Sequence, residues 1–177
     1  MLIVMVRAIA IFCAAATAFC VFTADAADLD LGRVAGVYIE GFMNGNMEGG
    51  KYWSDDILEI VKLSPNTAYF RTYLAFFNGH QCAIWGVAEV TGPSLVYRNP
   101  ETQCELHLDV ADGKIAFDDK HGHCRLGTCG NRGMYGSETF KESFKLTSRR
   151  PIRYMPKLLA SQQYLTALKD YQDRQPH

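Results

Sequence analysis

The densest group of residues able to carry chemistry is His121, His123, Cys124 and Cys129, which follow one another in the pattern His-x-His-Cys-x4-Cys. Imidazole nitrogen and thiolate sulfur are ligands that zinc prefers, so the pattern offers four donors for one ion. Cys124 beside Arg125 also allows a second chemistry, in which the thiolate is a nucleophile. Both chemistries need reduced cysteines, and the compartment of the protein therefore decides between them and a disulfide.

The N-terminus predicts that compartment. Its apolar stretch from Leu2 to Val21 is interrupted by Arg7, and Ala24-Asp25-Ala26 then supplies the small-x-small pattern of a signal peptidase site. We expect residues 1–26 to be a signal peptide removed after Ala26, which makes the mature chain periplasmic or secreted, without stable membrane insertion. The alternative, a retained membrane anchor, is less consistent with a short stretch that lacks a basic stop-transfer flank.

Cleavage would remove Cys13 and Cys20 and leave four cysteines in the mature chain: Cys82, Cys104, Cys124 and Cys129. An even number in an oxidising compartment predicts two disulfides, and four cysteines allow three connectivities. We favour Cys82 with Cys104 and Cys124 with Cys129. The alternative joins Cys104 to the Cys124 region, because a turn at Ala111 to Gly113 would bring the far ends of the two flanking strands together. With either pairing we expect no bound metal and no cofactor.

The region from Val34 to about Thr147 has the pattern of an all-β protein. Turn residues such as Asn78-Gly79 and Asp112-Gly113 separate its apolar or alternating runs, and they suit tight hairpins because they take positive φ at little cost. The runs are Val34–Met43, Ile57–Leu63, Ala68–Phe77, Gln81–Val90, Leu95–Arg98, Cys104–Val110, Lys114–Asp118 and Thr139–Leu146. We therefore predict a small antiparallel meander of about eight strands, closed as a barrel or folded as a sandwich.

The pattern changes after Pro151. Leu158, Ser161, Leu165 and Leu168 recur at helical spacing, which predicts a C-terminal helix over about 156–173 that packs on the barrel's outside or across one end. Residues 27–177 have the length of one domain. Their charges are balanced, since the whole chain has 18 Lys and Arg against 19 Asp and Glu, and this balance gives no reason to expect nucleic acid as a partner.

The segment from Cys124 to Phe140 is the most distinctive part of the mature chain. Glycine stands at positions 127, 130, 133 and 136, a spacing that disfavours a strand and predicts a shaped loop. We expect Asn131, Arg132 and Tyr135 to be binding residues on this loop, because the neighbouring glycines leave Arg132 and Tyr135 little to pack against. The alternative is a disulfide-stapled turn that only closes a corner of the barrel.

The order of these motifs resembles that of a known group of proteins. Cys82, Cys104-Glu105-Leu106, Asp112-Gly113 and Cys124-x4-Cys129-Gly-x-Arg-Gly together resemble the cysteine-rich β part of exported bacterial proteins described as lysozyme-inhibitor-like. The similarity covers about Gln81 to Phe140. It implies a small β-barrel with a loop that enters an enzyme's cleft, although the Ser-Gly-x-x-Tyr signature of the periplasmic lysozyme inhibitors is absent here.

Several other side chains are better explained by structure. Asp55-Asp56 and Asp118-Asp119 are neighbours in sequence, so on a strand their carboxylates point apart and form no acid/base couple. His80 and His107 have no partner at a useful spacing. A group of aromatic residues on two expected strands could stack on sugar rings, but we assign it to the core: Tyr69, Phe70, Tyr73, Phe76, Phe77 and Trp85.

These observations favour a non-enzymatic, exported binding module. It would act on a protein or cell-envelope partner through the Gly/Arg loop, with inhibition of a lysozyme-type peptidoglycan hydrolase as the most specific version. One alternative is a peptidoglycan-acting enzyme that uses Cys124 or a His/Cys metal site, since His123-Cys124-Arg125 resembles the Cys and Arg of exported cysteine transpeptidases. Another is a barrel that carries a small apolar ligand, since Gly36-x-Tyr38 resembles the opening strand of lipocalin-like barrels.

Overall fold

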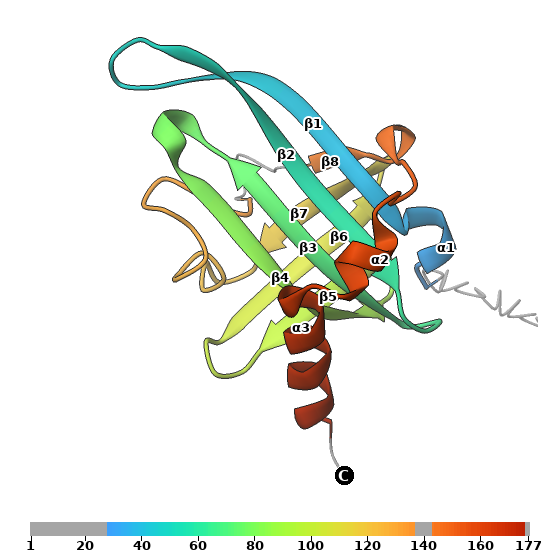
Figure 1. Cartoon of the computed structure of the whole chain (residues 1–177). Helices are drawn as coiled ribbons and strands as arrows, with labels where there is room; N and C mark the ends of the chain where they lie inside the picture. Colours follow the sequence, from blue (N-terminus) through green and yellow to red (C-terminus); the bar gives the residue numbers. More distant parts are fainter. Residues whose placement is uncertain (1–27, 137–142, 176–177) are drawn as a thin grey trace, which may run out of the picture.

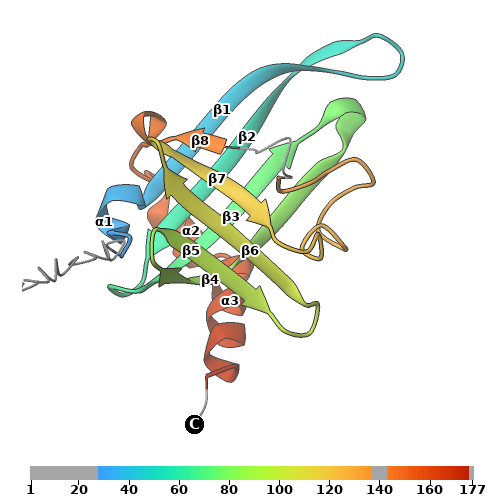
Figure 2. The same cartoon turned by 180° about the vertical axis from the view of Figure 1, so that it is seen from behind.

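The computed structural model describes residues 28–136 and 143–175, so the expected signal peptide, residues 137–142 and the last two residues lie outside the description. Within the described residues, eight antiparallel strands follow one another in sequence order in a single sheet, which confirms the predicted mainly β meander (Figures 1 and 2). The strands are β1 (Gly36–Gly45), β2 (Lys51–Lys62), β3 (Thr67–Ala75), β4 (Gln81–Thr91), β5 (Ser94–Asn99), β6 (Cys104–Ala111), β7 (Lys114–Asp119) and β8 (Ser143–Lys145).

The sheet curls into a nearly closed barrel rather than a two-sheet sandwich. At the seam, the backbone N–H of Lys145 in β8 donates to Glu40 Oε1 in β1 over 3.4 Å. Beyond β8, Val37 and Arg150 exchange two backbone hydrogen bonds of 2.8 and 2.9 Å. These contacts protect the outer edge of β1, which would otherwise present unpaired backbone groups.

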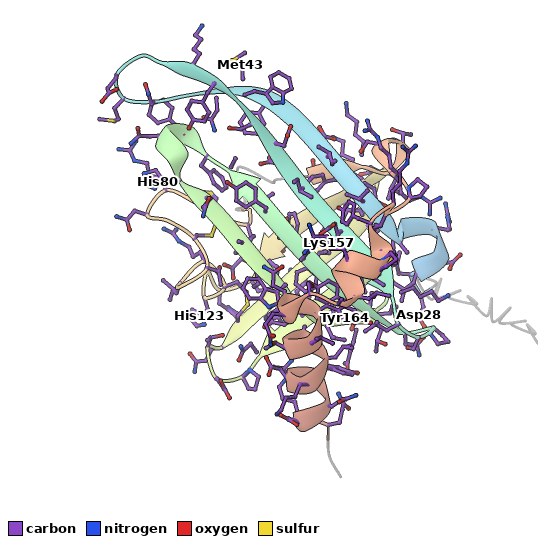
Figure 3. All side chains as sticks on the ribbon, viewed as in Figure 1. Asp28, Met43, His80, His123, Lys157 and Tyr164 are labelled. Atoms are coloured by element: carbon purple, nitrogen blue, oxygen red, sulfur yellow. A yellow bond between two sulfur atoms is a disulfide. The ribbon has the colours of Figure 1, made fainter. Side chains whose placement is uncertain are left out.

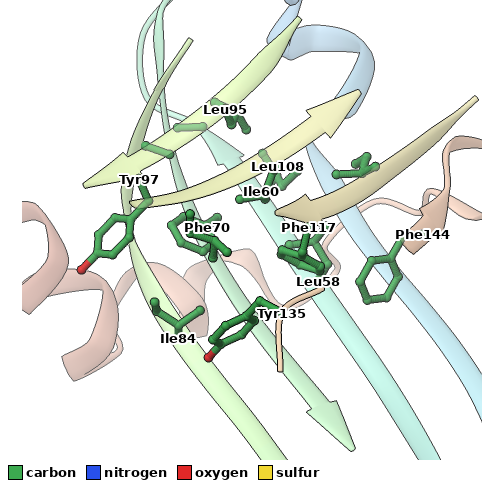
Figure 4. Packing of buried hydrophobic residues seen from close by; sticks show 14 of the residues in the cluster. Leu58, Ile60, Phe70, Ile84, Leu95, Tyr97, Leu108, Phe117, Tyr135 and Phe144 are labelled. Carbon is green, nitrogen blue, oxygen red and sulfur yellow. The ribbon is translucent and has the colours of Figure 1, made fainter. Parts of the chain in front are cut away.

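Alternation along the strands decides which side chains enter the barrel. In β6, Leu106 and Leu108 are buried inside while Glu105, His107 and Asp109 stay partly exposed outside. Large side chains from most strands meet in this interior (Figure 4). The largest fully buried side chains are Tyr38, Tyr69, Tyr135, Phe70, Phe117, Phe144, Leu31, Leu58, Ile60, Leu74, Leu95 and Leu106. Of these, only Tyr69 belongs to a separate cluster on the outside of the barrel.

One end of the barrel is covered by the short helix α1 (Leu31–Val34). Asp30 caps this helix, accepting the Gly32 N–H at 2.9 Å. The buried Tyr38 hydroxyl donates to the Val34 carbonyl over 2.7 Å. Arg149, which follows the single turn η2 (Leu146–Ser148), donates from Nη1 to the Gly32 carbonyl at 2.9 Å. The other end, where β1 meets β2, β3 meets β4 and β7 leads to β8, lies away from α1 and is here called the open end.

The expected C-terminal helix is divided into α2 (Met155–Leu159) and α3 (Gln162–Asp173). The break occurs because Ser161 caps α3, its hydroxyl accepting the Tyr164 N–H at 3.3 Å. Leu165, which the spacing placed on the packing face, is 50% exposed. The packing face carries Tyr164 instead, whose ring meets that of Tyr69 edge-on at 5.0 Å on the outside of the barrel (Figure 3).

The helices are also held by a polar network on this outer face. The carboxylate of Glu59 in β2 is buried and accepts hydrogen bonds from the guanidinium of Arg71 in β3 and from the Tyr154 hydroxyl. The same guanidinium donates from Nη1 to Gln163 Oε1 at 3.1 Å, which reaches α3. Among the described residues, no helix combines the length and apolar character needed to span a bilayer.

Candidate functional site

The connection from β7 to β8 lies at the open end, and its described part, residues 120–136, is here called the disulfide loop. Two disulfides hold it, Cys82–Cys129 and Cys104–Cys124. The prediction of two disulfides is therefore confirmed. The favoured pairing of Cys82 with Cys104 and Cys124 with Cys129 is wrong, whereas the alternative bond from Cys104 to Cys124 is present.

Hairpin geometry explains the Cys104–Cys124 bond. β6 and β7 are antiparallel in a register that places Leu106 opposite Asp119. Cys104 begins β6 and Cys124 follows the end of β7, so both lie at the same end of the hairpin. The carboxylate of Asp119 then fixes the chain direction, accepting the backbone N–H groups of Cys124 at 3.2 Å and Arg125 at 3.1 Å.

A split in the barrel wall explains the Cys82–Cys129 bond. β4 and β5 pair only over Glu89–Thr91 and Ser94–Val96, so the first half of β4 has no partner in β5. Backbone groups of the disulfide loop pair with this half of β4 instead. The Ala83 N–H donates to the Thr128 carbonyl at 2.9 Å, and the Gly130 N–H donates to the Gln81 carbonyl at 2.8 Å. Cys129 thus lies directly opposite Cys82.

Tyr135 anchors the loop and is not part of the predicted exposed surface. Its ring is fully buried and faces Phe117, with 6.2 Å between ring centroids, and Figure 4 shows it inside the core near Ile84 and Leu58. Its hydroxyl donates to Thr128 Oγ1 at 2.9 Å, and burial raises its pKa. The expectation that Tyr135 is exposed is wrong, because the chain after Gly133 turns back into the open end, where this large aromatic side chain fills the barrel.

Asn131 and Arg132, by contrast, are both exposed. They are the central residues of a turn in which the Gly133 N–H donates to the Gly130 carbonyl at 2.9 Å. Gly133 lies so close to the Cys82–Cys129 disulfide that an added Cβ would be 2.5 Å from Cys82 Sγ. The turn is therefore pressed against a covalent bridge, and its two tip side chains are presented on a rigid base.

The rest of the loop adds one apolar and two imidazole side chains at the surface. Leu126 is 66% exposed. The ring centroids of His121 and His123 lie 6.0 Å apart, and His123 Nδ1 is 3.2 Å from the Gln103 carbonyl oxygen. Figure 3 shows His123 on the disulfide loop. Because Cys124 and Cys129 are oxidised, the sequence-derived zinc set loses two of its four donors, and the described residues contain no group of three or more metal-ligating side chains.

The same bonds exclude the nucleophile hypothesis for this oxidised form. The sulfur of Cys124 is bonded to that of Cys104, so Cys124 has no thiolate to attack a substrate. The alternative of an enzyme that uses Cys124 or a His/Cys metal site is therefore not supported. The alternative of an apolar ligand inside the barrel gains no support either, because aromatic and aliphatic side chains, Tyr135 among them, fill the interior.

The sequence interpretation missed a pair of carboxylates and a histidine partner. Glu40 and Asp56 are directly opposite in the β1–β2 register, on the inner face near the open end. Burial raises the pKa of Asp56 from 3.8 to about 6, and Glu40 and Asp55 add to the rise, while the Ala75 N–H that donates to Asp56 Oδ1 at 2.7 Å opposes it. Only knowledge of the hairpin register could have revealed the pair.

His107 does have a partner, in Glu105, two residues earlier on the same outer face of β6. The atoms His107 Nε2 and Glu105 Oε1 are 2.7 Å apart. Hydrogen bonds from His107 and Arg98 lower the pKa of Glu105. An i, i+2 search along the strand would have found this contact, since side chains alternate with period two.

Comparison with known proteins adds no assignment: no family model, curated protein or solved structure matches the chain. Its two disulfides are consistent with an exported, disulfide-stabilised protein from an oxidising compartment.

Proposed function

We propose that the protein is an exported binding module that recognises a protein partner in the cell envelope through Asn131 and Arg132 at the tip of the disulfide loop. The observation that carries the proposal is the turn from Gly130 to Gly133, whose two central side chains are exposed while its base rests on a disulfide and a strand edge. A loop that is ordered before binding loses little conformational entropy when a partner arrives.

The chemistry of the tip favours a carboxylate-bearing partner. Arginine presents a planar fork of N–H donors that matches a carboxylate in a two-bond arrangement, and asparagine adds a donor and an acceptor beside it. A hydrolase whose cleft contains catalytic carboxylates fits this chemistry. The resemblance of residues 81–140 to lysozyme-inhibitor-like proteins supports the same choice, so inhibition of a peptidoglycan hydrolase is the specific form of the proposal.

The proposal is tested by partner capture and by hydrolase inhibition with single variants. Arg132→Ala should weaken capture from envelope extract by about 30-fold, the effect of a hot spot of about 2 kcal/mol, while the melting temperature stays unchanged. Arg132→Lys should lose much of the effect as well, because lysine keeps the charge but not the fork. Arg153→Ala is the matched control, since Arg153 is also exposed but lies outside the loop.

Equal capture by the wild type, the Arg132→Ala variant and the Arg153→Ala variant would show that the loop is only a structural corner. The hydrolase version has its own test. Purified oxidised protein should slow a lysozyme-type enzyme on peptidoglycan in a dose-dependent manner, and Arg132→Ala should relieve that inhibition. Capture of a partner without inhibition would keep the binding module and reject the inhibitor.

A further inference from the structure

Trp85 stands between two hollows on the outer face of the barrel. Its side chain is 38% exposed, so the assignment of Trp85 to the core is wrong, as it is for Tyr73 and Phe77, which are 39% and 44% exposed. The larger hollow has a volume of about 290 Å³ and the smaller one about 230 Å³, and both are lined by Ala83 and Trp85. The indole thus contributes a wall to each hollow, and the two hollows adjoin.

The larger hollow lies at the split between β4 and β5. The disulfide loop forms one wall with Leu126 and Thr128, next to the Cys104–Cys124 bridge. Tyr97 reaches it through the split, and Figure 4 shows its hydroxyl pointing away from the core cluster. An added Cβ at Gly86 would lie 2.2 Å from the Tyr97 ring, so glycine is what lets this ring approach β4 so closely.

The smaller hollow lies where α2 and α3 meet the barrel. Tyr73 and Tyr154 stand at its sides, and its polar surface is formed by the paired groups of Glu59 and Arg71 together with Gln163. Both charges of this pair are already matched within the protein. The smaller hollow is therefore electrically neutral, with aromatic walls and amide and hydroxyl groups.

One stripe of α3 joins the two hollows. Gln163 lines the smaller hollow, and Thr166 and Asp170 line the larger one. The spacing of three and then four residues places these side chains on a single helix face, along roughly 10 Å of its axis at 1.5 Å per residue. The Asp170 carboxylate accepts no hydrogen bond from the described part of the chain, so its oxygens are available there to a ligand.

We propose that these two hollows form a binding site for a glycan chain, with one sugar ring on each side of Trp85. A pyranose ring has an apolar C–H face and a rim of hydroxyl groups. The indole and the phenol rings offer flat apolar surfaces for the former, while Asp170, Thr166 and the Gln163 amide offer acceptors and donors for the latter. Binding sites for small ligands commonly combine an apolar lining with a few polar groups that orient the ligand, as these hollows do.

The backbone around the hollows favours a glycan over an extended peptide. A peptide that adds to a sheet needs a run of free backbone groups along a strand edge. On β4 that edge is taken at Gln81–Ala83 by the disulfide loop and at Glu89–Thr91 by β5. Only the short stretch around Trp85 is left, and it offers a side-chain surface. The glycan site does not depend on Asn131 and Arg132, and therefore goes beyond the proposed function.

The test uses four-ring oligosaccharides as probes: the tetramer of β-1,4-linked N-acetylglucosamine, cellotetraose and maltotetraose. The chain contains two tryptophans, Trp53 and Trp85, so a Trp53→Phe variant leaves Trp85 as the single tryptophan, whose fluorescence can be excited selectively. We expect at least one probe to change its fluorescence in a saturable manner. Calorimetry should then show that Trp85→Ala weakens binding of that probe about tenfold or more, a change of about 1.4 kcal/mol.

Two further variants keep the test decisive. Trp53→Ala should bind as the wild type does, because Trp53 is 63% exposed on the β1–β2 hairpin, away from both hollows. Asp170→Asn changes an exposed helix position and should weaken binding several-fold without affecting the fold. Absence of saturable binding up to about 10 mM for all three probes, or equal affinities of Trp85→Ala and Trp53→Ala, would overturn the site. Arg132→Ala should leave glycan binding intact.

Discussion

Replacing Tyr135 with alanine tests the central structural claim about the disulfide loop, namely that its aromatic residue anchors the loop in the barrel. The ring is fully buried against Phe117, and its hydroxyl donates to Thr128 Oγ1. If Tyr135 were instead a surface residue, the change would alter the free energy of unfolding by no more than about 0.5 kcal/mol.

The expected loss follows from the burial. An aromatic side chain removes about 150–250 Å² from water, which at about 25 cal/mol per Å² gives about 4–6 kcal/mol as an upper value. Truncating large aromatic residues to alanine in protein cores costs about 3–5 kcal/mol, so about 4 kcal/mol is expected for Tyr135→Ala. Tyr135→Phe removes only the hydrogen bond to Thr128 and should cost about 1 kcal/mol.

Differential scanning calorimetry of the oxidised protein measures both changes. For a chain of this size, each kcal/mol corresponds to about 2–4 °C, so Tyr135→Ala should melt about 8–16 °C below the wild type. Tyr73→Ala is the matched control, because Tyr73 is 39% exposed, and it should shift the midpoint far less. Equal melting temperatures for Tyr135→Ala and Tyr73→Ala would refute the anchored loop and return Tyr135 to the exposed surface.

Two other predictions concern the cross-links and the buried carboxyl group. Non-reducing peptide mapping should recover the disulfide-linked peptides Cys82–Cys129 and Cys104–Cys124. Their sequence separations are 47 and 20, so removing each bond should lower the free energy of unfolding by about 4 and about 3 kcal/mol, respectively. Recovery of a Cys82–Cys104 peptide would contradict the pairing of the disulfide loop with β4. Because the pKa of Asp56 rises from 3.8 to about 6 on folding, its contribution to stability is fully present below about pH 4 and is lost as the pH rises through 6. Asp56→Asn should therefore reduce the loss of stability between pH 4 and pH 7 by roughly 1–3 kcal/mol in denaturant titrations, and an unchanged pH profile would show that the carboxyl group titrates normally.

The sequence by itself determined the local elements of this protein. Strands and turns follow from short-range rules, since alternation over Glu105–Val110 and the positive φ of Asp112 are properties of neighbouring residues. The sequence left the Cys104–Cys124 bond as the alternative pairing, and the hairpin register explains it, because an antiparallel register fixes which ends meet. Even the cap at Ser161 could have been found locally, since serine at the start of an apolar helical pattern is a common helix start.

Only the tertiary structure decided which side chains of the disulfide loop are exposed and which are buried. Arg132 and Tyr135 are three residues apart among glycines, yet one is exposed and the other fills the barrel, because the chain reverses at Gly133 against the Cys82–Cys129 bridge. That bridge in turn depends on the incomplete pairing of β4 with β5, which no local pattern reveals. Burial and pairing between distant segments are properties of the closed barrel, and they also place Trp85 beside α3 to form the hollows proposed to bind a glycan.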